Sequence, residues 1–103
     1  MNERYSGKPF LKLLDSYVLA AIGHLDAESD SALTAMEPKL HDTFGATGSW
    51  RSIVESRMQF PAGMTAAIRE VWDEGKTKFA AIEGGEPDPL EFTTIFVDTN
   101  FPH

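Results

Sequence analysis

The chain has 103 residues, 42% of them hydrophobic and 24% charged, which are ordinary values for one globular domain. Its net charge of −7 disfavours binding to nucleic acid and to anionic membrane surfaces, because both depend on clustered Lys and Arg. The absence of cysteine excludes disulfides, thiolate metal centres and cysteine nucleophiles.

The apolar run YVLAAIG near the N-terminus is too short to cross a membrane. No small-residue cleavage site follows it, so it does not fit a secretory signal either. We therefore expect a cytoplasmic protein that has no contact with a membrane. Its acidity suits either solubility alone or attraction to a basic protein partner.

Apolar spacing and turn residues predict an all-α fold, a compact single-domain bundle of about five helices with short loops over residues 1–103. The first helix is expected from Pro9 to Leu25, with proline in its first turn. Apolar side chains surround most of its circumference. This pattern is typical of a central helix with neighbours on several sides.

A second helix is expected after Asp26, an N-cap residue, and should end at Gly45. Pro38 lies inside it. Because the apolar stripe keeps its phase across this proline, we expect a kink in one helix and not a break.

Ser49 is predicted to cap a short third helix that begins at Trp50. A fourth helix, from Met64 to Ile82, has the most regular apolar stripe in the chain, and Gly75 lies in the middle of it. Since glycine weakens a helix, we expect another helix to cross closely at this residue.

The last helix is expected to begin at Asp88 and Pro89, which supply a cap and a first-turn proline. The segment FTTIFV within it has the composition of a strand, but a single strand would have no partner. Helical projection places its apolar residues on two opposed faces. One face holds Leu90, Val97 and Phe101, and the other holds Phe92, Ile95 and Phe96.

One of these two faces must dock on the core, and the other is either covered by neighbouring helices or left at the surface. We expect Phe92, Ile95 and Phe96 to remain exposed and to bind a protein partner or a second copy of the chain. The competing interpretation is a last helix packed between other helices.

An anionic ligand is the alternative. Glycines precede the N-terminus of the third helix in GATGSW, and Ser49 and Arg51 could bind a phosphate there, although a glycine C-cap followed by a serine N-cap explains the motif equally well. Arg57 falls within an apolar stripe. It could bind a carboxylate or phosphate, or simply cover the core with its methylenes.

Glu37 and His41 are four residues apart and would share one helix face, which is the minimum geometry for two metal ligands. No third ligand is identifiable, so we expect no metal. His24 should interact with the dipole at the end of the first helix.

No GxSxG elbow or other combination of nucleophile and base occurs, so we expect neither enzyme activity nor a cofactor. The leading hypothesis is a small acidic protein-binding module, such as an adaptor, an inhibitor or an immunity-type protein.

Overall fold

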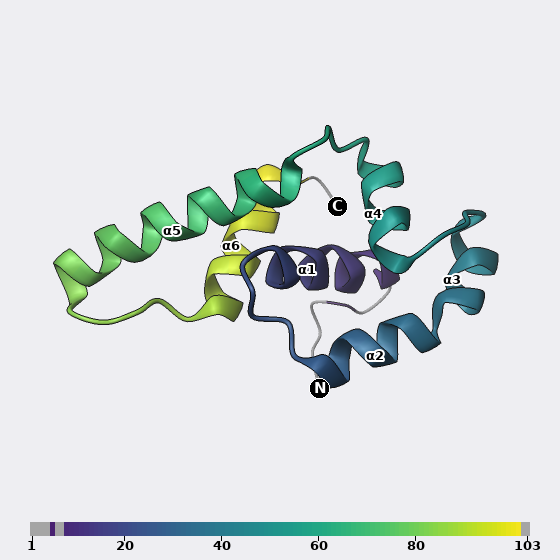
Figure 1. The fold of residues 1–103 in the computed structure, drawn as a ribbon, viewed down its shortest axis with the longest axis horizontal. Helices are drawn as coiled ribbons and strands as arrows, with labels where there is room; N and C mark the ends of the chain where they lie inside the picture. Colours follow the sequence, from purple (N-terminus) through teal and green to yellow (C-terminus); the bar gives the residue numbers. More distant parts are fainter. Residues whose placement is uncertain (1–4, 6–7, 102–103) are drawn as a thin grey trace.

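Six α-helices and no strand make up the part of the chain that the computed structural model describes, residue 5 and residues 8–101 (Figure 1). The expected all-α class is confirmed, with one helix more than predicted. The helices are α1 (Pro9–Ala21), α2 (Ala27–Ala35), α3 (Glu37–Phe44), α4 (Trp50–Met58), α5 (Met64–Glu83) and α6 (Pro89–Asn100).

The additional helix arises at Pro38, where the predicted kink is wrong and the chain breaks into α2 and α3. Met36 ends α2 and also precedes the first residue of α3. Pro38 has no N–H to continue the α2 hydrogen-bond pattern, but it fits the first turn of a new helix, where that N–H is not needed. The proline therefore starts a helix instead of bending one.

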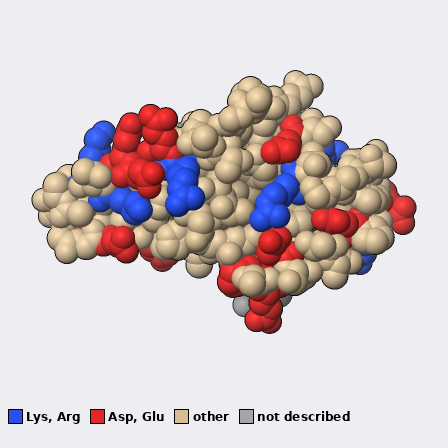
Figure 2. Space-filling view, in the orientation of Figure 1, with Lys and Arg blue, Asp and Glu red and all other residues tan. Residues whose placement is uncertain are grey.

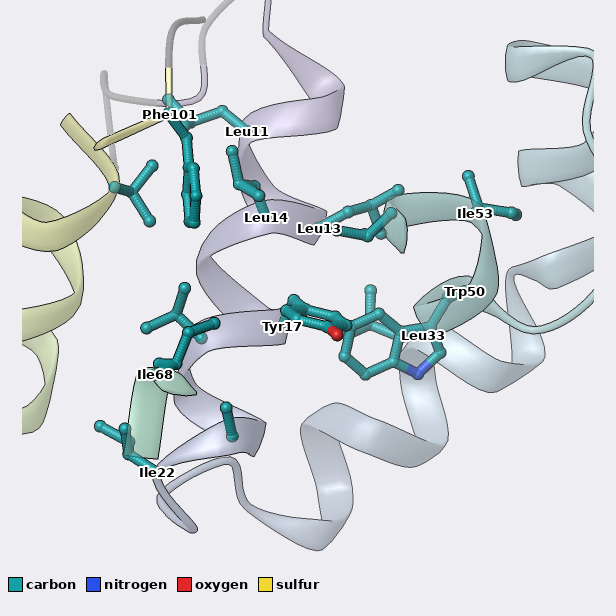
Figure 3. Close-up of a cluster of buried hydrophobic side chains, with 14 of the residues drawn as sticks. Leu11, Leu13, Leu14, Tyr17, Ile22, Leu33, Trp50, Ile53, Ile68 and Phe101 are labelled. Atoms are coloured by element: carbon teal, nitrogen blue, oxygen red, sulfur yellow. The ribbon is translucent and has the colours of Figure 1, made fainter. Parts of the chain in front are cut away.

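Helix α1 lies at the centre of the fold, as its apolar circumference predicted. It packs against α4, α5 and α6 (Figure 3). It ends at Ala21, before the predicted Leu25, because Gly23 turns the chain at φ 79°. The core that surrounds it consists of Leu11, Leu13, Leu14, Tyr17, Val18, Ala21, Ile22, Leu33, Leu40, Trp50, Ile53, Val54, Ile68, Trp72, Val97 and Phe101.

The predicted caps are present at three helix starts. Asp26 accepts a hydrogen bond from the Ser29 N–H, and Ser49 accepts one from the Ser52 N–H. Asp88 accepts one from the Leu90 N–H at the start of α6. The segment FTTIFV is helical, so packing against α1 overrides its β propensity.

In the long helix α5, only the first half contributes buried residues to the core. Ile68 and Trp72 are buried, whereas no residue from 73 to 83 is buried. Figure 1 shows this second half extending beyond α6. No helix in the described part of the chain is long and apolar enough to cross a membrane.

The close helix crossing predicted at Gly75 is wrong. A Cβ added to Gly75 would meet no atom within 4 Å. The glycine therefore lies where the apolar stripe of α5 passes from the core to the surface, and no neighbouring helix in the described chain requires its small size.

Candidate functional site

A groove lies between the projecting half of α5 and the first turns of α6. Its volume is about 250 Å³. Gly75 and Phe79 form the α5 side, while Phe92 and Ile95 form the α6 side. Pro87, in the connection between the two helices, closes one end, with Asp88 and Glu91 beside it. The lining is mostly apolar, with acidic side chains at its edge.

Helix α6 is held in place by a buried face of Thr93, Val97 and Phe101. Val97 and Phe101 were predicted to share a face, but Leu90, assigned to the same face, is 62% exposed. It lies in the first turn of α6, where it borders a second pocket together with Leu19 and Leu25.

The opposite face of α6 divides between core and solvent. Phe92 and Phe96 are half-buried, and their rings lie 5.6 Å apart. Phe92 meets the Trp72 ring edge-on at 4.9 Å, and Phe96 meets Phe101 at 5.5 Å. These contacts anchor both rings on the protein. Ile95 is 58% exposed and is the residue of the predicted partner-binding set that lies open at the groove.

Helix α5 contributes a further set of apolar residues that sequence reasoning did not connect with binding. Val71, Phe79 and Ile82 are exposed along one stripe, and Ile82 is 80% exposed. The observed helix lengths explain this exposure. Twenty residues span about 30 Å, but α1 and α6, with 13 and 12 residues, span less than about 20 Å each and cannot cover all of α5.

Charged side chains of both signs lie beside the α5 stripe. Lys76 forms an ion pair with Asp73, N to O 3.5 Å. Figure 2 shows basic and acidic side chains next to one another over the end of the molecule that α5 forms. On the face in view, this end of the molecule is therefore of mixed charge, in contrast to the acidic composition of the whole chain.

The N-terminus of α4, the candidate anion site, faces two carboxylates of the chain itself. Glu37 Oε2 accepts a hydrogen bond from the Trp50 N–H at 3.0 Å. Asp30 accepts one from the Trp50 indole and also pairs with Arg51, Nη1 to Oδ1 3.3 Å. Ser49 Oγ bonds to Ser52. Carboxylates from α2 and α3 thus supply negative charge at this helix terminus.

Arg57 lies at the other end of α4, apart from Ser49 and Arg51. Its guanidinium is 5.1 Å from the Phe10 ring centre and 5.0 Å from that of Phe44. The two rings meet edge-on at 5.6 Å. Arg57 therefore covers the junction of α1 and α3 by cation–π contact.

Glu37 and His41 also have partners within the chain. His41 Nε2 is 2.7 Å from the Gly48 carbonyl oxygen, while Glu37 binds the Trp50 N–H. Among the described residues, no three His, Cys, Asp or Glu side chains group to hold a metal ion. The predicted interaction of the His24 side chain with the end of α1 is not among the contacts of the described residues. The His24 ring instead meets Trp72 edge-on at 5.4 Å.

No protein-family model, curated protein or solved structure matches the chain. Its function must therefore be inferred from the groove and the residues around it.

Proposed function

We propose that the chain is a cytoplasmic protein-binding module whose docking surface is the groove together with the projecting half of α5. We call this the α5–α6 surface and define it as Val71, Gly75, Phe79, Ile82, Phe92 and Ile95. The observation that carries the proposal is the apolar stripe of α5, which continues into solvent for about three turns beyond its last buried residue, Trp72.

Large apolar side chains that cluster at a surface mark interaction sites more often than isolated ones do. The groove volume of about 250 Å³ is below the range of about 300 to 1,000 Å³ that is typical of small-molecule pockets. It suits one or two inserted side chains. A helix that presents such side chains on one face is the form of partner that grooves of this kind accept.

The role of Phe92 and Phe96 changes in this proposal. Their contacts with Trp72 and Phe101 make them supports for the surface, while Ile82 and Ile95 make the contact with the partner. The module requires no cofactor, metal or nucleic acid. The alternative of an anionic ligand at Ser49, Arg51 or Arg57 gains no support, because carboxylates or aromatic rings already face these groups.

Ile82→Lys tests the proposal because it places a charge on the α5–α6 surface without touching the core. Since Ile82 is 80% exposed, we expect the melting temperature to stay nearly the same. The wild type and the variant would be immobilised and exposed to lysate of the source cells. We expect a partner, either another protein or untagged copies of the chain, to bind the wild type and to be lost from Ile82→Lys.

Ala80→Lys is the matched control, because Ala80 is exposed on the far side of α5 and gains the same charge. It should bind like the wild type. Recovery of the same proteins at the same level from all three baits would contradict the proposal.

A further inference from the structure

We propose that the occupant of the α5–α6 surface is helix α5 of a second copy of the chain, packed antiparallel to the first. This inference rests on the proposed function and names its partner. A two-fold axis would relate the two helices and cross the apolar stripe at the level of Lys76 and Thr77. Residues on the N-terminal side of this level in one copy then face residues on its C-terminal side in the other.

Shape is the first argument for a second copy. Gly75 and Phe79 lie one helical turn apart on the same stripe, and the space above Gly75 is open. The proposed axis brings Phe79 of each copy over Gly75 of the other, where the absent side chain leaves room for a ring. It also brings Val71 opposite Ile82. The small and large residues of one helix thus match the large and small residues of the other.

Charge is the second argument. Glu74 and Lys78 are one turn apart and lie along the same edge of the apolar stripe. In an antiparallel pair, like edges of the two helices meet, and the same axis places Glu74 of each copy opposite Lys78 of the other. Among the described residues Lys78 has no acidic partner within 4 Å. One register therefore satisfies both the apolar and the charged positions.

The net charge of −7 would oppose self-association if it were spread evenly over the surface. Helix α5 carries less than its share, because three basic side chains stand against four acidic ones. Its net charge is −1. Asp88 and Glu91 add two acids at the edge of the groove, but a second copy finds the opposite charge at both matched positions of α5, Glu74 and Lys78.

The dimer should be weak. About three turns of helix from each copy bury less than the roughly 800 Å² per partner of a standard stable interface. We therefore expect a dissociation constant on the order of micromolar, with the monomer dominant at low concentration.

Two single substitutions test the register. Lys78→Glu places acids at both matched positions, and Glu74→Lys places bases there, so each variant alone should self-associate roughly tenfold more weakly than the wild type. An equimolar mixture of the two should form a heterodimer as tight as the wild-type dimer, because every matched position again has opposite charges. Sedimentation equilibrium of the full chain measures all four constants.

Glu70→Lys is the control. It makes the same charge change as Glu74→Lys but lies on the far side of α5, and it should dimerise at least as well as the wild type. Circular dichroism of each variant should match that of the wild type, since none of the three side chains is buried.

Two outcomes would overturn the inference: a wild type that stays monomeric up to the highest concentration reached, or a mixture of the two variants that associates no better than either alone. Lysate capture distinguishes this failure from failure of the proposed function. If Ile82→Lys still loses a different bound protein, the α5–α6 surface is a docking site and only the identity of its occupant is wrong.

Discussion

At the scale of single residues, Thr93 breaks the rule that buried polar groups find partners. It is 1% exposed within α6, and its hydroxyl has no hydrogen-bond partner in the described part of the chain. An unpaired buried hydroxyl costs about 1 to 3 kcal/mol by comparison with protein mutational data. The sequence carries no sign of this, because threonine is usually exposed and nothing in the local pattern marks Thr93 as buried.

Thr93→Val removes the hydroxyl and keeps the branched shape, so we expect the free energy of unfolding to rise by about 1 kcal/mol. Urea denaturation measures the change. The same substitution at exposed Thr99 should stay within about 0.5 kcal/mol of the wild type. A loss of stability in Thr93→Val would mean that the hydroxyl has a partner, such as an ordered water.

At the scale of elements, α5 combines a half that packs on the core with a half that is exposed to solvent. Ile68 and Trp72 hold the first half. The second half depends on its own helix propensity unless a partner covers it, and Gly75 lowers that propensity where the two halves meet. The exposed half should therefore be the part of α5 that opens most readily.

Gly75→Ala should stabilise the protein by about 0.5 to 1 kcal/mol, because the new Cβ meets no atom within 4 Å and alanine favours the helix. Thermal denaturation at low protein concentration measures the effect on the monomer. Gly84→Ala is the control. It also meets no atom, but its φ of 77° strains any residue with a Cβ, so it should destabilise. Destabilisation of the Gly75 variant would restore the idea of a close contact there.

At the scale of the whole molecule, the projecting helix affects both shape and cohesion. The radius of gyration is 14.3 Å, whereas a compact domain of this length has about 13 Å. The end of α5, where no residue is buried, contributes to this extension. Cohesion between α1, α4 and α5 depends in part on Tyr17, whose hydroxyl bonds to Glu55 at 2.8 Å and to Thr65 at 3.1 Å.

Burial raises the pKa of Tyr17 above its ordinary value of 10.0, and the hydrogen bond from Thr65 offsets part of the rise. Because the folded pKa exceeds the unfolded one, the phenol contributes stability that is fully present below about pH 10 and lost as the pH rises through the folded value. We expect Tyr17→Phe to cost about 1 kcal/mol at pH 7 and this difference to shrink above pH 10. Urea denaturation at several pH values measures it. A difference that stays constant through this range would contradict the shift.

The sequence was sufficient to predict the elements that depend on local chemistry. Asp26, Ser49 and Asp88 start helices because a side-chain oxygen near a free N–H is enough to favour the cap. The central place of α1 followed from its apolar circumference. Pro38 was misjudged, because an apolar stripe can keep its phase through a break as well as through a kink.

The candidate site was predicted only in part. Ile95 was expected at the surface and is exposed, but the same reasoning placed Leu90 on the buried face and left Phe92 and Phe96 open. Helical projection shows which residues share a face, but not how far a neighbouring helix reaches along it. The groove was not predicted for this reason. It lies where α5 extends past the core, beside the first turns of α6.

What the amino-acid sequence determined by itself, therefore, was the all-α class, the starts of most helices and the identity of the central one. These features depend on interactions within a few residues or on the total apolar surface of one helix. Tertiary structure alone decided that Gly75 faces open space, that carboxylates from α2 and α3 meet the start of α4, and that α5 extends beyond the core. Each depends on how segments far apart in the sequence are positioned relative to one another, and the apolar periodicity of a single helix carries no information about those positions.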